Sequence, residues 1–173
     1  MSRIVLFFLF LSAFAYSQNY EQLMAYSRFY NQKIDSFIDF MMTSPTVDTA
    51  NDGVRQIVYE MKGFNVAIEE RSAGTDNIGQ IFIFKVDSKH AHSDWQKIHE
   101  KIKKDNTFKF VKAMYEDQNV SYNEMTIEQL KQYLKNKKSD DANYAVRYER
   151  DSAFYTVSVM DGNMVVTIDD KNY

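Results

Sequence analysis

The stretch YAVRYERDSAFYTVSVMDGNMVVTID, residues 144–169, decides the fold. Near its end Asp161-Gly162 separates two runs of alternating apolar and polar residues, which is the strongest short-range signal for a two-residue β-hairpin turn. A second turn at Asp151-Ser152 adds one strand before this hairpin. The facing pairs on one side are then all apolar: Val159–Met164, Val157–Val166, Tyr155–Ile168, Tyr148–Tyr155, Val146–Val157 and Tyr144–Val159. Because a slip by one residue would send these side chains to the other face, the pattern predicts the register of a three-stranded meander.

Two more strands, Val54–Met61 and Phe64–Glu70, are predicted to form a hairpin around Lys62-Gly63. The turn pairs Met61 with Phe64, Tyr59 with Val66 and Ile57 with Ile68, and it sets Arg55 opposite Glu70 as an opposite-charge pair. The residues before this hairpin, Thr46–Gly53, are interpreted as a loop.

Two single strands complete the predicted sheet. Ile81-Phe82-Ile83-Phe84 is apolar at every position, as expected of a central strand. Phe108–Tyr115 alternates, with Phe108, Phe110 and Met114 on one face. Ser72–Gly79 is interpreted as a connection between strands.

Three helices are predicted from apolar spacings of three and four. Tyr20–Met42 is interpreted as one long helix, ended by Ser44-Pro45 because a residue before proline avoids helical geometry. Two shorter helices begin at capping boxes, Ser93–Gln96 and Thr126–Gln129, and run to about Lys104 and to Lys138. Trp95, Ile98 and Ile102 should face inward in the first, and Ile127, Leu130 and Leu134 in the second.

These elements predict an α+β fold, a two-layer sandwich in which one long N-terminal helix and two shorter ones pack on one face of a mostly antiparallel sheet. The composition is that of a globular chain, with 45% hydrophobic and 26% charged residues. We expect a single α+β domain over residues 18–173.

Residues 1–17 have the pattern of a secretory signal peptide: Arg3, an apolar run from Ile4 to Leu11, then small residues. Cleavage is expected near Ser17/Gln18, with cleavage after Ala15 as the alternative and no transmembrane segment in the mature chain. The chain has no Cys, which excludes a disulfide scaffold and a thiol nucleophile. We therefore expect an exported bacterial envelope protein that is periplasmic or secreted.

The one cluster with possible metal chemistry is Lys89–Trp95, which contains His90, His92 and Asp94. Imidazole and carboxylate groups suit zinc, so a metal-binding protein or metal-dependent hydrolase is one alternative. The other interpretation makes Ser93 a helix cap, Asp94 a favourable charge at the helix start and the histidines loop residues, with His99 stacked four residues after Trp95. We expect this second interpretation, with no metal ligand, catalytic residue or cofactor.

Other short motifs are weaker signals. Asp48-Thr49-Ala50 and Asp151-Ser152-Ala153 match a three-residue pattern used for O-glycosylation in some bacterial envelopes, with plain loops as the alternative. No Gly-x-Ser-x-Gly elbow or phosphate-binding glycine loop is present. The 12 tyrosines supply either a binding surface or core filling, and core filling is expected.

A patterned fold without a catalytic motif favours a non-catalytic protein- or peptide-binding module over an enzyme. Its expected partner is another envelope or secreted protein. A net charge of −3 without a basic patch argues against nucleic acid as the partner. A periplasmic inhibitor or immunity-type protein is the remaining alternative.

Overall fold

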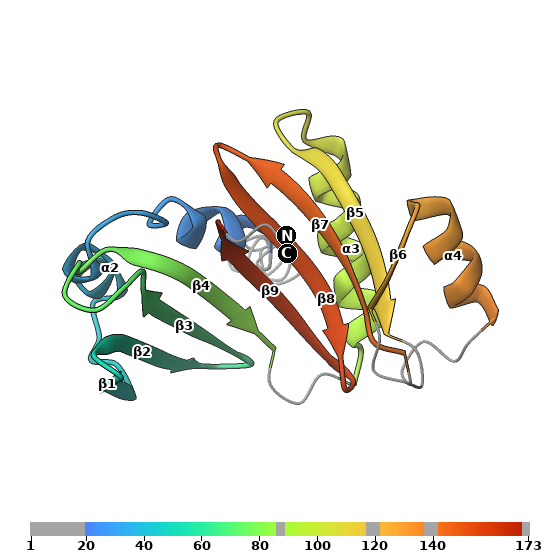
Figure 1. The fold of residues 1–173 in the computed structure, drawn as a ribbon. Helices are drawn as coiled ribbons and strands as arrows, with labels where there is room; N and C mark the ends of the chain where they lie inside the picture. Colours follow the sequence, from blue (N-terminus) through green and yellow to red (C-terminus); the bar gives the residue numbers. More distant parts are fainter. Residues whose placement is uncertain (1–19, 86–88, 117–121, 137–141, 171–173) are drawn as a thin grey trace, which may run out of the picture.

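The structure is a computed structural model that describes residues 20–85, 89–116, 122–136 and 142–170. The predicted signal peptide, residues 1–17, lies outside these ranges. Nine strands form one antiparallel sheet in the order β1-β2-β3-β4-β9-β8-β7-β5-β6 (Figure 1). The strands are β1 (Val47–Asn51), β2 (Val54–Met61), β3 (Phe64–Glu70), β4 (Ile78–Phe84), β5 (Lys109–Glu116), β6 (Tyr122–Met125), β7 (Tyr144–Arg150), β8 (Ala153–Met160) and β9 (Asn163–Asp169). The helices are residues 20–27, α2 (Ile34–Met41), α3 (Ala91–Lys104) and α4 (Ile127–Asn136). The predicted class, α+β with an antiparallel sheet, is confirmed.

The C-terminal meander has the predicted register at every pair. Val157 lies between Val146 of β7 and Val166 of β9, and the flanking pairs follow the same register. Both turns have two successive residues with positive φ, Asp151 and Ser152 at 51° and 64° and Asp161 and Gly162 at 50° and 72°. Two positive φ values are what a type I′ turn requires, and such a turn matches the twist of the paired strands.

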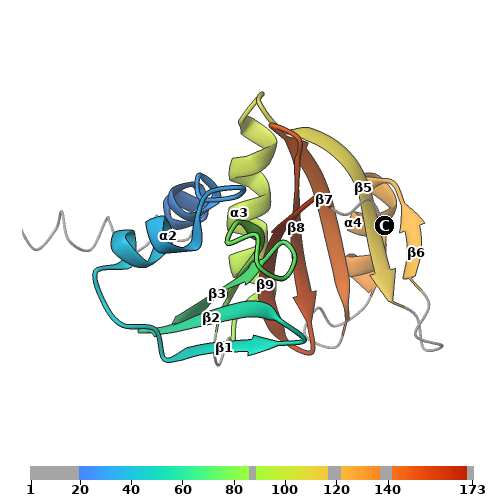
Figure 2. The ribbon, with the colours of Figure 1, turned by 60° about the vertical axis from the view of Figure 1, so that its left-hand side comes forward.

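The register divides the sheet into two faces. The face that carries Tyr59, Val157 and Tyr115, here called the helix face, contacts α2 through Phe37–Tyr59, α3 through Trp95–Val157 and α4 through Tyr133–Tyr115. Figure 2 shows that the sheet is strongly twisted, with β1 and β2 running across the direction of β7 and β8. We call the opposite side the outer face.

The hairpin around Lys62-Gly63 also has the predicted register. Arg55 and Glu70 lie together as predicted, but they are joined through the Arg55 backbone N–H and not through its guanidinium. The Arg55 guanidinium binds the Asp48 carboxylate at 2.9 and 2.7 Å, while Glu70 accepts backbone N–H groups from Asp76 and Arg55. These backbone donors, that of Asp76 first, lower the pKa of Glu70.

The single long N-terminal helix is wrong, because residues 28–33 leave the helical conformation. Asn31 has a φ of 65° and donates its backbone N–H to Ile78, which donates back to Gln32. Ile34 likewise donates to Asp76. These long-range backbone bonds at the start of β4 replace helical ones, so the amphipathic stripe continues on two short helices. The second ends at Met41, one residue before the predicted end.

Residues 46–53, predicted as a loop, contain strand β1, which pairs with β2 through a turn at Asp52-Gly53. All five residues of β1 are exposed, so this strand lacks the alternation that marks a half-buried strand. The short edge strand β6 was also missed. In β5, an irregularity between Phe110 and Lys112 shifts the alternation, so Ala113 is buried on the helix face and Met114 faces the other way. The predicted shared face of Phe108, Phe110 and Met114 is therefore wrong.

Helix α3 begins at Ala91 with His90 at its N-cap, three residues before the predicted cap, so the Ser93 capping box is wrong. Its end at Lys104 and its inward residues Trp95, Ile98 and Ile102 are confirmed. The other capping box is confirmed: the Thr126 backbone N–H donates to the Gln129 side chain, and the Gln129 N–H donates to the Thr126 hydroxyl. Residues 137 and 138, the predicted end of this helix, lie outside the described ranges.

Candidate functional site

The structure places His90, His92 and Asp94 at the start of α3, but the three side chains have different surroundings and different partners. His90 is exposed, and His92 binds the Tyr144 hydroxyl of β7 through Nδ1 and Gln96 through Nε2. Asp94 is buried and ion-paired with Lys85 and Lys97. Among the described residues, no three His, Cys, Asp or Glu side chains are grouped so that they could hold a metal ion.

The buried Asp94 carboxylate connects α3 to the end of β4. Desolvation raises its pKa, but the bonds from Lys85 and Lys97 outweigh this effect, and the net shift of the pKa is downward. Asp94 therefore stays ionised and anchors the first turn of α3 to the sheet. Asp94 lies in the first turn of the helix as predicted, and its ion pairs with Lys85 and Lys97 were not predicted.

A stack of rings connects α3 to β7 and β8. Trp95 stacks on His99 with centroids 4.8 Å apart and planes 5° apart, as predicted, and His92 stacks on it at 6.0 Å. The Trp95 indole N–H donates to the Val157 carbonyl at 3.0 Å. His99 Nδ1 lies 2.6 Å from the Tyr148 hydroxyl. The two histidines nearest Trp95 are thus held by the ring stack and by tyrosines of β7.

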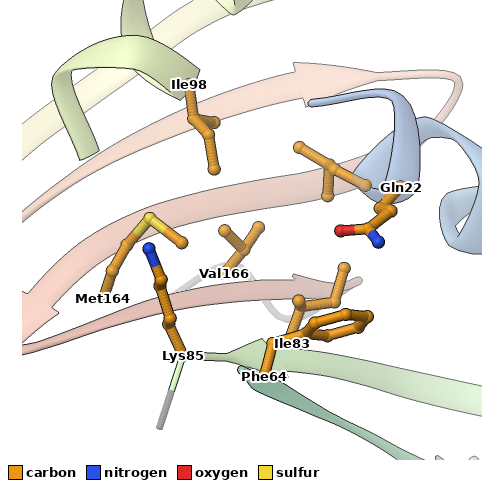
Figure 3. Close-up of a pocket in the computed structure, with 8 residues that line it drawn as sticks. Gln22, Phe64, Ile83, Lys85, Ile98, Met164 and Val166 are labelled. Carbon is orange, nitrogen blue, oxygen red and sulfur yellow. The ribbon is translucent and has the colours of Figure 1, made fainter. Parts of the chain in front are cut away.

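The interior beside α3 holds a cavity of about 10 Å³, which has room for roughly one water molecule. Its wall includes Phe64, Ile83 and Val166 from the sheet and Ile98 from α3 (Figure 3). Figure 3 also shows the Lys85 side chain extending past Met164. A space this small and apolar is a packing defect of the core rather than a ligand site.

The outer face carries one continuous cross-strand row. Pairing partners run directly from strand to strand through Val47, Val58, Ala67, Phe82, Thr167, Thr156, Arg147 and Lys112. The first four are apolar and the last four are polar or basic. We call this set the outer-face row. Val47 is 39% exposed, and Val58, Ala67 and Phe82 are half-buried.

The outer face is hollowed at the polar half of this row, and the hollow has a volume of about 590 Å³. That volume lies within the range of ligand pockets, about 300–1,000 Å³. Small side chains, Ala145, Thr156, Ser158 and Thr167, line it together with Met114 and Met160. The remaining lining residues are Gln80, Lys112, Glu124, Arg147 and Asp169.

A buried ion pair forms part of this hollow. Arg147 binds the Asp169 carboxylate at 2.7 Å, with side chains only 4% and 3% exposed, and donates to the Thr156 hydroxyl at 2.8 Å. The guanidinium also lies 4.4 Å from the Phe154 ring centroid. An ion pair that is held from several sides is rigid, so it gives the hollow a preformed polar group.

Sequence reasoning missed the outer-face row because it followed the apolar residues on the other side of each strand. Two signals were present. Phe82 and Phe84 add apolar residues on the second face of the predicted central strand, and Arg147 and Asp169 lie on the same face of the predicted meander, on the two strands that flank its middle strand.

The remaining candidate residues are not members of the outer-face row, although Thr49 lies on the same face of β1 as Val47. Thr49 is exposed on β1 and Ser152 is exposed in the β7–β8 turn. Tyr26 and Tyr30 are buried, and Tyr20 is half-buried with its hydroxyl on Asp105, so these tyrosines belong to the core and its margin. No helix within the described ranges is long and apolar enough to cross a membrane.

Comparison of this chain with family models, with curated proteins and with solved structures finds no match.

Proposed function

We propose that this chain is an exported, non-catalytic binding module of the bacterial envelope that holds a protein or peptide partner on the outer face of its sheet. The proposed arrangement is the two-layer sandwich, in which the helices cover the helix face and leave the other face for the partner. The outer-face row carries the proposal, because it continues an apolar strip into a hollow with preformed polar groups.

The chemistry of this surface suits an extended segment of a partner protein. Apolar side chains of the partner would cover Val58, Ala67 and Phe82, where burial of apolar area stabilises a complex. Backbone or amide groups would meet the threonines of the hollow. Charges are balanced there, with Arg147 paired to Asp169 and Lys112 to Glu124, so the surface does not demand a strongly charged partner.

The experiment is an affinity pull-down from the cell envelope of the source bacterium, with three forms of the protein. Ala67→Lys places a charge in the centre of the apolar strip, and Gln132→Lys makes the same charge change at an exposed position of α4. One partner should be recovered with the wild type and with Gln132→Lys and lost with Ala67→Lys. Recovery of the same proteins with all three forms, or of none, contradicts the proposal.

The inhibitor or immunity-type alternative is tested by the same pull-down, since the recovered partner would then be a secreted enzyme. The recovered protein is assayed for its own activity with and without the module. Inhibition that Ala67→Lys abolishes assigns that role to the outer face.

A further inference from the structure

A second, separate hollow lies on the helix face, between α3 and α4. Its volume is about 500 Å³. One wall comes from α3 through Trp95, His99 and Glu100, and the other from α4 through Lys131, Leu134 and Lys135. Figures 1 and 2 both show α3 and α4 standing apart on this end of the sheet. We call this hollow the α3–α4 cleft.

One residue that lines the cleft, His99, has a buried ring nitrogen without a hydrogen bond to any described residue. His99 is 3% exposed, and its Nδ1 is bound to Tyr148, but within the described part of the chain its Nε2 has no hydrogen-bond partner. A buried donor or acceptor left in this way lowers the stability of the folded protein, because the group has lost its bonds to water without gaining others. A ligand bound in the cleft could supply the missing hydrogen bond.

The tautomer of His99 decides which way the bond to Tyr148 runs and whether Nε2 is a donor or an acceptor. Desolvation lowers the pKa of His99 and raises that of Tyr148, so both groups are neutral near neutral pH. We assign the phenol as the donor to Nδ1, which leaves the ring proton on Nε2. Nε2 is then an N–H donor that requires an acceptor oxygen.

The opposite wall supplies positive charge. Lys131 and Lys135 lie one helical turn apart on α4 and are exposed, and within the described ranges neither makes an ion pair. Glu100 on the α3 wall carries one opposing charge. The formal balance of one positive charge suits a monoanion better than a phosphate dianion.

We propose that the α3–α4 cleft binds an amphipathic organic carboxylate. Its carboxylate accepts from His99 Nε2 and the ammonium groups of Lys131 and Lys135, and its apolar part lies against Leu134 and the edge of Trp95. Nε2 has no accessible surface, so the side chains that cover it must move for the carboxylate to reach it. The proposal concerns the helix face and does not rest on the function proposed for the outer face.

The test uses Trp95, which is the only tryptophan of the chain and lines the cleft. Its fluorescence is followed while the full chain is titrated with decanoate below the micelle-forming concentration. Decyltrimethylammonium, with the same alkyl chain and the opposite charge, is the ligand control. We expect a saturable change with decanoate and binding of the cation at least about tenfold weaker, equivalent to about 1.4 kcal/mol. No saturable change, or equal binding of both amphiphiles, overturns the proposal.

Variants then locate the carboxylate. The double change Lys131→Glu and Lys135→Glu should weaken decanoate binding roughly tenfold, because two exposed attractive charges become repulsive. Lys62→Glu in the β2–β3 turn makes the same kind of charge change at an exposed site away from the cleft and should leave binding unchanged. Equal affinity of the double variant and the wild type would contradict the proposal.

A second readout addresses His99 directly. In ¹⁵N-labelled protein the His99 Nε2–H resonance should shift with the same saturation as the Trp95 signal, and an unshifted resonance would remove His99 from the site. Ala67→Lys on the outer face is expected to leave decanoate binding unchanged. The two proposals can therefore fail independently.

Discussion

Two hairpins of this sheet turn on the same dipeptide, Asp-Gly, and lead to strands of opposite character. Asp52-Gly53 and Asp161-Gly162 have nearly the same backbone, with φ values of 52° and 79° against 50° and 72°. The second joins β8 to β9 in the middle of the sheet, where Val157 and Val166 are almost fully buried. The first joins β1 to β2 at one edge, and all five residues of β1 are exposed.

The comparison separates two effects on a β-strand, one on where the strand begins and one on whether it is buried. Turn chemistry decides where the chain reverses, and it acts alike in both hairpins. Apolar side chains decide whether the new strand lies under the helices, since a buried Val or Ile contributes about 1.5–3 kcal/mol. β1 offers one large apolar residue, Val47, and is held instead by its backbone pairing and by the Asp48–Arg55 ion pair.

The largest expected effect is Val157→Asp, which places a carboxylate among Val146, Val166 and Trp95. An unpaired buried charge there should cost about 4 kcal/mol or more, enough to unfold much of the protein. Thr49→Asp makes a comparable change on β1 and should stay within about 0.5 kcal/mol. Urea unfolding measures both. Similar losses for the two variants would refute the contrast between the hairpins.

Asp169→Ala removes one partner of the buried Arg147–Asp169 pair. The stranded guanidinium should lower the free energy of unfolding by about 3–5 kcal/mol. Asp170→Ala, at the neighbouring and much more exposed carboxylate, should cost about 1 kcal/mol or less. The double change Arg147→Met and Asp169→Leu should recover most of the loss, because no charge is then left unpaired. A double variant as unstable as Asp169→Ala would argue against this account.

Asp94→Asn tests how α3 is tied to β4 through Lys85. The folded-state pKa of Asp94 is lower than its usual value of 3.8, so the ionised group stabilises the fold above that pH, and this contribution disappears as pH falls through the folded-state pKa. The wild type should therefore be more stable than the variant at about pH 7, and the difference should shrink below about pH 4. A difference that stays constant over this range would show that the charge is not the cause.

Gly162→Ala and Gly53→Ala compare the two turns directly. Both glycines have positive φ, so each change should cost about 1 kcal/mol or more in the turn itself. The new Cβ at Gly162 meets nothing within 4 Å, whereas at Gly53 it lies 3.1 Å from the Cβ of Ala73. Gly162→Ala should lower global stability, and Gly53→Ala should mainly speed amide hydrogen exchange in β1. Unchanged or slower hydrogen exchange of the β1 amides in Gly53→Ala would contradict the view of β1 as a loosely held edge.

Asp48→Ala is expected to have the smallest effect. The carboxylate binds the Arg55 guanidinium with both oxygens, and Arg55 holds the pKa of Asp48 below its usual value, but both side chains are partly exposed. The loss should be about 0.5 kcal/mol, because solvent and salt screen exposed ion pairs. Thermal melts at low and high salt measure it, and a loss well above about 1 kcal/mol would make this pair a main support of β1.

Among the candidate sites, sequence reasoning found the ring contact between Trp95 and His99 because residues four apart share a helix face. It did not find Tyr144 of β7 as a partner of His92, or Lys85, which directly follows β4, as a partner of Asp94. The outer-face row and the α3–α4 cleft depend on residues from several separate elements, and no spacing along the chain brings such residues together.

The sequence by itself determined the meander, the hairpin around Lys62-Gly63 and the α4 cap, because alternating side chains, positive-φ turn residues and a capping box act over a few neighbouring positions. Only the tertiary structure decided the break at residues 28–33, the edge strand β1 and the shifted face of β5. Each of these depends on backbone bonds to a distant segment, such as Asn31 to Ile78 and Val47–Asn51 to β2. Such bonds form when the sheet is assembled, and their partners leave no periodic signal in the local sequence.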